Sequence, residues 1–560
     1  MHNDKLRVGI LVDSYRVPAW AHLMLEKISQ SNYAEIVLVV VNNSTSENLP
    51  FCDSLSTRRR SLLSTLVTRL LSYAQKHILG RASPVNDARK NVDADQLLQG
   101  IPSIKVIPIQ TKFTDTFDHA EISRIRQHKT DVLIRLGFRI LKGDILTAAR
   151  YGVWSYHHGD NLVNRGGPPG FWETMESWPE TGSVLQVLTD DLNGGTVLYR
   201  SWSCTDVMSV ANNNNARYMT SASFVPRMLQ RLHKLGAEKF FEEVGKRNAY
   251  PLFYCSRFLS RPGNGKLFRM LCSKAMEKVQ RKIRSNFYFR QWILLFDFRG
   301  FASTSFWRFK RIVPPRDRFW ADPFAVERDG SYYIFIEEYL YASRKGHISV
   351  FEMDANGNYD EPAPVIEEGH HLSYPFVFSH EGTLYMVAEA LEARVVPLYR
   401  CDEFPHKWVF VCNLLEDIAA VDPTLFERDG TWFLFVGVAE NAGSSDWDEL
   451  FLYSSKDLID GQWNGHPLNP IVSDVKSARP AGRLIEHRGA LYRPSQNSAH
   501  HYGYGLNFSL IKTLNEREYE EQIVSRVEPK WSKDIVSIHT YTNSGQLTVV
   551  DGQLRRAKYW

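Results

Sequence analysis

Residues 320–335 read Trp-Ala-Asp-Pro-Phe-Ala-Val-Glu-Arg-Asp-Gly-Ser-Tyr-Tyr-Ile-Phe and decide the fold of the second half of this 560-residue chain. The stretch joins an aspartate–proline pair to a glycine turn and then to an aromatic strand. The same order returns at three further places, which begin with Tyr374-Pro375, Asp422-Pro423 and Arg479-Pro480. The hairpin glycines, of which Gly545 is the last, recur at intervals of about 50 residues, a period typical of β-propeller blades.

These repeats predict a multidomain protein in which residues 291–560 form an all-β five-bladed propeller. A strand at residues 292–296 is expected to close its ring. The first half differs, because short continuous apolar runs such as residues 6–12 suit parallel strands that are covered on both faces. We therefore expect a Rossmann-like α/β domain over residues 1–225 and a basic helical linker over residues 226–290.

The composition excludes several classes of protein. A net charge of +4 gives no global attraction to nucleic acid. The six cysteines include no Cys-x-x-Cys pair, which argues against a structural zinc site and fits a reducing compartment. We therefore expect no metal. Because we find neither a signal peptide nor an apolar run long enough to span a bilayer, we expect a cytoplasmic protein.

Two stretches of the sequence are basic, one at residues 58–81 and the other at residues 257–290, and the first also carries apolar residues at helical spacing. We favour a surface helix for the first stretch and a solvated connector for the second. The alternative is that both make peripheral contact with an anionic membrane surface, which would place the protein at the inner face of the membrane.

The inner strands of a propeller converge on its axis, and the residues that begin these strands are candidates for a binding site. Here they include two carboxylates, Asp322 and Asp422. The other candidates are Trp320, Tyr374, Glu389, Arg479, Arg493 and His539. Carboxylates and aromatic faces suit the hydroxyls and ring faces of sugars, and arginines suit phosphate or a carboxylated sugar. The alternative interpretation is that the Asp-Pro pairs only cap the strands.

The second half resembles two families. The Asp-Pro pair, glycine turn and aromatic strand resemble the five-bladed glycoside hydrolases, which implies that Asp322 is a general base and that Asp422 tunes pKa values. Arg479 stands where the general acid of those enzymes is expected, and Glu337, Glu338 and Glu389, which end second strands, are possible substitutes for it. A closer resemblance, to the propeller of the glucosamine inositolphosphorylceramide transferases, is carried by residues 320–324, 372–377, 478–483 and 491–496.

The first half contains a different candidate site. An expected strand ends in a Ser-Tyr-His-His run at residues 155–158, and a loop rich in glycine and proline follows it. Over residues 5–225 the chain resembles the formyltransferases that take a formyl group from N10-formyltetrahydrofolate. The resemblance implies that this cofactor is used and that the substrate lies at Arg165 and Gly166.

The catalytic trio of that family falls on Ser155, His157 and Asn193 in this sequence. His157 would polarise the formyl oxygen or move a proton. Asn193 replaces a carboxylate, and Asp160 is close enough in sequence to supply one instead.

Both halves point to glycoconjugates. We expect a transferase of cell-surface polysaccharide assembly that formylates an amino sugar and whose propeller binds or processes a glycan. The expected partners are an amino sugar, a sugar nucleotide or a phosphorylated glycan. One alternative is a glycosyltransferase or glycoside hydrolase centred on the propeller, with the first domain as a scaffold. A non-catalytic glycan-binding protein is the other.

Overall fold

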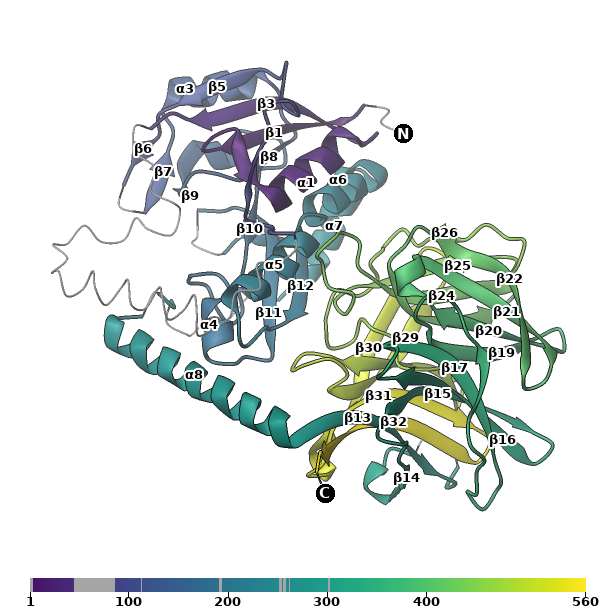
Figure 1. Ribbon diagram of the computed structural model, residues 1–560. Coiled ribbons are helices and arrows are strands. Elements are labelled where there is room, and N and C mark those ends of the chain that lie inside the picture. The colour runs from purple at the N-terminus through teal and green to yellow at the C-terminus, as the bar shows by residue number, and fades with distance from the viewer. Residues whose placement is uncertain are drawn as a thin grey trace. The chain divides into compact units, whose positions relative to one another are not determined.

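The computed structural model describes residues 4–44, 86–111, 113–190, 194–250, 254, 258–260, 262–300 and 303–559. The basic stretch at residues 58–81 and the predicted catalytic residue Asn193 lie outside these ranges. The chain divides into two compact units (Figure 1), which are Met1–Lys278 with Asn441–Ser444 and Val279–Glu440 with Ser445–Trp560.

The first unit is built on a seven-stranded sheet. From one edge to the other its strands are β12 (Thr196–Cys204), β11 (Glu180–Val187), β10 (Val153–His157), β8 (Val132–Arg135), β1 (Leu6–Val12), β3 (Ala34–Asn42) and β5 (Ser103–Val106). The five strands from β10 to β5 are parallel, and β11 and β12 are antiparallel additions. The parallel strands follow the order 3-2-1-4-5 along the chain, as in doubly wound α/β folds.

Helices cover both faces of this sheet. One face packs against α1 (Ala19–Ser29), α5 (Val210–Ser221), α6 (Phe224–Leu235) and α7 (Ala237–Arg247). The other face packs against α3 (His119–Gln127) and the 3₁₀ helix η1 (Gly143–Thr147). The remaining elements are α4 (Phe171–Met175), α8 (Asn264–Phe287), the pair β2 (Arg16–Pro18) and β4 (Asn91–Asp93), and the small sheet of β6 (Ile109–Gln110), β7 (Thr114–Thr116) and β9 (Ile140–Leu141).

The expected domain boundary at residue 225 falls inside α6. Met228 and Leu232 of α6 and Phe240 of α7 are buried in the core of the first unit. Residues 226–247 therefore belong to that core, because their apolar faces pack on the sheet, and they are not a linker. Of the predicted linker, α8 is the part that connects this core to the strands of the second unit.

The second unit consists of five four-stranded sheets, which we call blades one to five (Figure 1). Blade one is β15 (Arg318–Arg328), β16 (Ser331–Leu340), β17 (Lys345–Met353) and β18 (Ala363–Ile366). Blade two is β19 (Ser373–His380), β20 (Thr383–Glu389), β21 (Val395–Glu403) and β22 (Lys407–Glu416). Blade three is β23 (Ala420–Arg428), β24 (Thr431–Val438), β25 (Leu450–Ser455) and β26 (Asn464–Gly465).

Blade four is β27 (Ile485–His487), β28 (Ala490–Asn497), β29 (Gly505–Leu514) and β30 (Tyr519–Val527). Blade five combines β31 (Ile535–Ser544) and β32 (Leu547–Ala557) with β13 (Tyr288–Asp297) and β14 (Lys310–Ile312). Short 3₁₀ helices occur at η2 (Phe306–Arg308), η3 (Leu391–Ala393) and η4 (Pro529–Trp531). Strand β13, the first strand of the unit, pairs along its whole length with β32, the last strand, and this pairing closes the ring. The strand expected at residues 292–296 to close the ring is therefore part of β13.

The hairpin turns explain why the repeat is visible in the sequence. In blade one the turn residues Asp329 and Gly330 have φ values of 53° and 80°, and in blade three Asp429 and Gly430 have 52° and 67°. Two consecutive residues with positive φ make a type I′ turn, whose twist matches that of the flanking strands. Glycine tolerates the second position without steric cost, so this residue recurs in each blade.

Candidate functional site at the propeller axis

The first strands of blades one, two and three share one backbone distortion. Asp322, Tyr374 and Asp422 have φ values of 50°, 49° and 50°, and each precedes a proline. The strand register shifts at each of these places, which is the mark of a β-bulge. A left-handed conformation at a residue other than glycine costs about 1–3 kcal/mol. A bulge re-aims a side chain, and here it sends the three side chains towards residues of other blades.

Asp322 contacts residues of blade five. Thr540 Oγ1 donates a hydrogen bond of 2.6 Å to its Oδ1, and the Nδ1 of His539 lies 3.8 Å from the same oxygen. Its own backbone N–H donates to Asp551 Oδ2 at 2.9 Å. Burial raises the pKa of Asp322 to about 6, with Asp422 and Asp551 adding to the rise and His539 opposing it. Asp322 can therefore exchange a proton near neutral pH.

Asp551 of β32 organises blade five at this point. Its carboxylate accepts the backbone N–H groups of His539 and Thr540 at 3.1 and 2.9 Å, and the Nδ1 of His539 at 2.6 Å. The His539 ring stacks on Trp292, with 4.0 Å between the ring centroids. Burial lowers the pKa of His539, but Asp551 and Asp322 outweigh burial and raise it. His539 is thus held as the cation of a buried ion pair.

One metal-like grouping occurs within the described residues. Possible ligand atoms of Asp322, His539 and Asp551 all lie within 4.8 Å of one another. However, the Nδ1 of His539 is already hydrogen-bonded to Asp551, and Asp551 also accepts three backbone N–H groups. These contacts satisfy the three side chains as an ion-paired group.

Asp422 is paired with Arg479, which precedes the first strand of blade four. Arg479 Nε donates to Asp422 Oδ2 at 2.5 Å, and its other nitrogens reach Glu389 at 3.4 Å and Asp446 at 3.1 Å. Gln496 donates to the same Asp422 oxygen at 2.7 Å. The backbone N–H of Asp422 donates to Glu389 at 3.0 Å, as that of Asp322 does to Asp551.

These groups perturb each other's protonation. Burial raises the pKa of Glu389 well above its usual value, and Asp422 adds to the rise while Arg479 opposes it. Burial would lower the pKa of Arg479, but Asp422 raises it above its usual value. Arg479 is therefore the counter-ion of a buried group of carboxylates.

Glu337 of β16, one of the possible substitutes for the general acid, lies beside Asp322. It pairs in register with Ala321, directly before the bulge at Asp322. The Nε2 of His371 lies 3.4 Å from its carboxylate, and His371 Nδ1 accepts the N–H of Gly346 at 2.9 Å. A neutral His371 therefore donates from Nε2 to Glu337. Burial raises the pKa of Glu337 well above its usual value, and Asp322 and Glu389 raise it further.

The repeat in the sequence distinguishes Glu337 from the neighbouring Glu338. Glu337, Glu389 and Gln496 stand the same number of residues after their hairpin glycines, so the three blades place them at equivalent points. Blade three has Gly437 at this point, where an added Cβ would lie 2.7 Å from the Val421 side chain. The second strands of blades one, two and four thus supply polar side chains to the axial site.

The aromatic residues near the site are also different from those predicted. Tyr502 lies between two charged groups, with its ring centroid 4.9 Å from the Arg479 guanidinium and 5.3 Å from that of His539. Trp447 is 5.5 Å from Tyr502, and both are partly exposed. We call Asp322, Glu337, Glu389, Asp422, Arg479, Gln496, Tyr502, His539 and Asp551 the axial cluster.

Three predicted binding residues are engaged in packing instead. The Trp320 indole donates to Glu338 at 3.2 Å inside a hydrophobic cluster. The Tyr374 hydroxyl accepts the N–H of Gly482 at 2.6 Å and bonds Thr424 at 2.8 Å, so Tyr374 joins neighbouring blades. Arg493 forms an ion pair with Glu521 at 2.6 Å and donates to a backbone carbonyl. The spacing in the sequence predicts in which blade a residue lies, but contacts with neighbouring blades determine what its side chain packs against.

In the first unit, the predicted catalytic residues are engaged by other groups. Ser155 accepts a hydrogen bond of 2.8 Å from Arg135 Nη1. His157 Nε2 bonds the carbonyl of Asn164 at 3.0 Å, and burial lowers the pKa of His157. Asp160 accepts from the indole of Trp202 at 3.0 Å. The hydrogen bond that the structure gives His157 is thus to a backbone carbonyl, whereas the resemblance implied a carboxylate partner.

The predicted substrate loop is held by local contacts. Arg165 donates to the carbonyl of Asn161 at 2.8 Å, and its guanidinium lies 4.4 Å from the centroid of Tyr254. Gly166 lies so close to another segment that an added Cβ would stand 1.8 Å from the carbonyl oxygen of Leu259. The glycine is therefore required by a close backbone approach.

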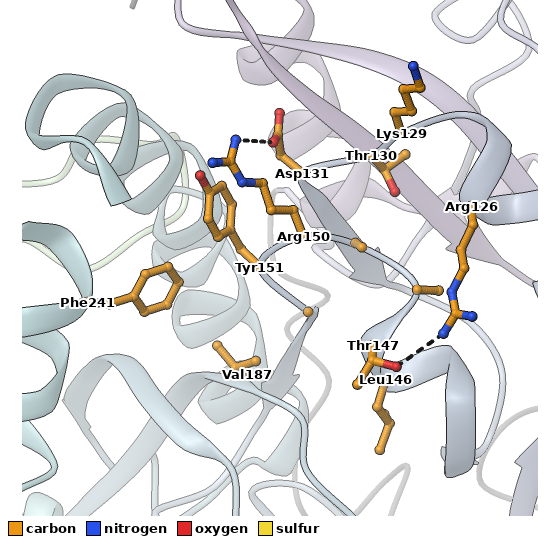
Figure 2. A pocket seen from close by; sticks show the side chains of 13 residues that line it. Arg126, Lys129, Thr130, Asp131, Leu146, Thr147, Arg150, Tyr151, Val187 and Phe241 are labelled. Carbon is orange, nitrogen blue, oxygen red and sulfur yellow. Dashed lines mark hydrogen bonds and ion pairs between the residues drawn. The ribbon is translucent and has the colours of Figure 1, made fainter. Parts of the chain in front are cut away.

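A cavity of about 860 Å³ lies elsewhere in the first unit (Figure 2). It is bordered by Asp131 and Gly152, which directly precede β8 and β10, and by Arg126 and Arg150. In Figure 2, Arg150 faces Asp131 at 4.0 Å and Arg126 donates to Thr147 at 3.4 Å. The cavity thus lies at the amino ends of the strands, whereas His157 lies at a carboxyl end, where doubly wound sheets bind ligands.

Much of the second unit is similar in sequence to known proteins. Residues 313–543 match the family model "Glucosamine inositolphosphorylceramide transferase 1, N-terminal". A protein named glucosamine inositolphosphorylceramide transferase 1 from Oryza sativa subsp. japonica is 34% identical over 212 residues, which are 36% of this chain and 27% of that protein. The protein of the same name from Arabidopsis thaliana is 33% identical over 207 residues, again 36% and 27% of the two chains.

The chain therefore spans about a quarter of the length of these relatives (27%). Among solved structures, the family 117 glycoside hydrolase Zg3597 of Zobellia galactanivorans aligns with 48% of this chain and 90% of its own, at 13% identity and a TM-score of 0.31. The family model begins after the first unit, so the formyltransferase resemblance of residues 5–225 stays a prediction.

Proposed function

We propose that this chain is a glycoconjugate-directed transferase whose propeller binds a sugar at the axial cluster. The observation that carries the proposal is the pair of strained bulges, which aim Asp322 and Asp422 into one buried group of carboxylates. Strain of this kind persists at functional sites because the surrounding structure over-determines it. The match of residues 313–543 to the N-terminal part of a family named for a glucosamine inositolphosphorylceramide transferase supports the choice of substrate class.

The proposed roles follow from the environments of the carboxyl groups. Asp322 is the proton acceptor, because its pKa of about 6 leaves it ionised yet basic near neutral pH. In a transfer, an acceptor hydroxyl attacks the anomeric carbon, the bond to the leaving group breaks, and the hydroxyl proton passes to Asp322. Glu337 is the proton donor to the departing group, because burial and the neighbouring carboxylates raise its pKa and so favour its protonated form.

The cations have positioning roles in this proposal. Arg479 is already engaged by Asp422, Glu389 and Asp446, so it fixes these carboxylates in place and does not hold a phosphate. Tyr502 and Trp447 are the partly exposed aromatic rings beside the cluster and offer faces on which a sugar ring can stack. The expected ligand is an amino sugar, either free, activated by a nucleotide or within a phosphorylated glycan.

Formyl transfer to an amino sugar from N10-formyltetrahydrofolate stays a separate prediction for the first unit. Because His157 is hydrogen-bonded to the backbone carbonyl of Asn164, its surroundings support formyl transfer less than the axial cluster supports sugar binding by the propeller. Equilibrium dialysis of the full chain against 5-formyltetrahydrofolate tests it, and a lack of saturable binding would remove it. That result would not affect the proposal for the propeller.

The proposal is tested by calorimetric titration of the full chain with glucosamine and with UDP-glucosamine. Asp322→Asn should weaken binding or turnover at least tenfold while the fold is kept. Asp360→Asn, at an exposed aspartate of blade one, is the matched control and should bind normally. Equal affinity in both variants would refute the proposal.

Product analysis separates the rival activities. A sugar transferred to an acceptor supports the transferase, and release of free sugar with water as acceptor supports a glycoside hydrolase. Binding that needs Asp322 but gives no product with any acceptor supports a non-catalytic glycan-binding protein.

A further inference from the structure

Helix α8 carries a stripe of exposed apolar side chains. Val279, Ile283 and Phe287 are 52%, 51% and 46% exposed, and Met276 and Phe268 continue the series towards the start of the helix. Their spacing of three or four residues, with Cys272 filling the interval, puts them on one face of the helix. We call these six residues the α8 stripe.

The second half of α8 lacks the support that helices in folded proteins usually have. The buried side chains of this 24-residue helix are Leu271 and Lys274, and every residue from 278 to 288 is exposed. A short helix in water is marginal unless an apolar face is packed against something. The regular stripe indicates that this face has a partner.

The charges around the stripe indicate what that partner is. Helix α8 has one acidic residue, Glu277, against seven basic residues, which are Lys266, Arg269, Lys274, Lys278, Arg281, Lys282 and Arg284. By helical spacing Lys282 lies on one side of the stripe and Arg284 on the other. Apolar residues between basic flanks are the pattern of a helix that lies in the interface of an anionic bilayer.

A basic groove continues from the end of the helix. It has a volume of about 400 Å³ and is lined by Arg284, Tyr288, Lys533, Asp534 and Arg555, all in the second unit. Asp534 is already paired with Arg311 at 2.7 Å, so the groove keeps an excess of positive charge. Burial lowers the pKa of the adjoining Arg290, and the nearby Arg555 and Arg281 lower it further. An anion in the groove would relieve this repulsion.

We propose that α8 and the basic groove dock this protein on an anionic membrane surface. The α8 stripe enters the boundary between headgroups and acyl chains, and the groove receives lipid phosphates. Among the described residues no helix has both the length and the apolar character to cross a bilayer, so the contact lies along the surface. A second copy of the chain fits less well, because stripe-to-stripe pairing would bring two strongly basic helices together.

Vesicle cosedimentation of the full chain tests this proposal. The protein should bind vesicles of phosphatidylcholine with phosphatidylserine, bind pure phosphatidylcholine poorly, and dissociate as salt is raised. Val279→Ser/Ile283→Ser and Lys282→Glu/Arg284→Glu should each weaken binding at least tenfold. Val524→Ser/Arg526→Glu, at exposed positions of β30, is the matched control and should bind like the unmodified protein.

Circular dichroism and thermal unfolding show whether each variant is folded. Equal binding to both kinds of vesicle, or unchanged binding in both α8 variants, would overturn the proposal. So would a dimer in sedimentation velocity that the stripe variant breaks. Saturable binding of inositol phosphates without binding to vesicles would mean that the groove holds a soluble anion, and would overturn it as well.

Discussion

Arg479 should be the residue whose loss most damages the propeller. It is 5% exposed and lies against the carboxylates of Asp422, Glu389 and Asp446. Arg479→Met keeps much of the side-chain volume but leaves buried carboxylates without their counter-ion. Removing one partner of a buried ion pair costs about 3–5 kcal/mol. We expect a loss of this size in the free energy of unfolding at neutral pH.

The loss should depend on pH in a defined direction. The pKa of Glu389 is already raised by burial and Asp422, and without Arg479 it should rise further. A carboxyl group with a raised folded pKa binds its proton in the folded state at pH values where the unfolded chain has released it. Stability therefore falls as pH rises through the interval between the two values. The penalty of Arg479→Met should be largest at neutral pH and smaller at mildly acidic pH.

Guanidinium unfolding of the full chain at neutral and at mildly acidic pH measures the loss in the free energy of unfolding. Hydrogen exchange at β23 shows whether the unfolding transition belongs to the propeller. The control is Arg400→Met, because Arg400 pairs with Asp402 at the surface, where ion pairs contribute about 0–1 kcal/mol. A penalty below about 1 kcal/mol at neutral pH, or one that does not change with pH, would show that Arg479 is not the counter-ion of the cluster.

Three further outcomes follow from single contacts. Tyr374→Phe should cost about 1–3 kcal/mol in a denaturant titration, because the N–H of Gly482 and the hydroxyl of Thr424 lose a buried partner, and a neutral result would contradict the bracing role. Glu337→Gln should leave the free energy of unfolding at neutral pH equal or higher, because glutamine is an isostere of the protonated carboxyl group. The variant should slow any turnover at least tenfold, and full turnover would exclude Glu337 as the acid. Burial and then Arg217 lower the pKa of His158 well below its usual 6.5, so below pH 6.5 the unfolded chain takes up a proton there that the folded chain does not. The contribution of a neutral His158 to the free energy of unfolding should therefore be complete above pH 6.5 and be lost as the pH falls below it. The free energy of unfolding of His158→Phe should fall less steeply with falling pH, and the same steepness in both proteins would argue against a buried neutral His158.

The fold of the propeller could be predicted from the sequence because its signal is local. Hairpin turns with positive φ favour glycine, and the strands beside them favour aromatic and β-branched residues. A hairpin glycine with positive φ recurs in each blade, so the number of blades follows from counting these glycines. The boundary of the first unit was harder to predict, because the apolar spacing of α6 and α7 indicates amphipathic helices but does not say which unit covers their apolar faces.

The sequence by itself also predicted that Asp322 and Asp422 lie at the axis, because both stand before the proline that recurs at the start of a blade's first strand. Glu389, Arg479 and His539 were also candidates from the sequence, and Glu337 was a possible substitute for the general acid. Only the tertiary structure showed that Trp320, Tyr374 and Arg493 turn into the packing of the blades. It also added Gln496, Tyr502 and Asp551 to the cluster. Which side chain meets which depends on contacts between blades far apart in the sequence, and these contacts also set the pKa values. The physical reason is that the interaction between two charged groups depends on their distance in space and on their burial, and the spacing of residues along the chain determines neither.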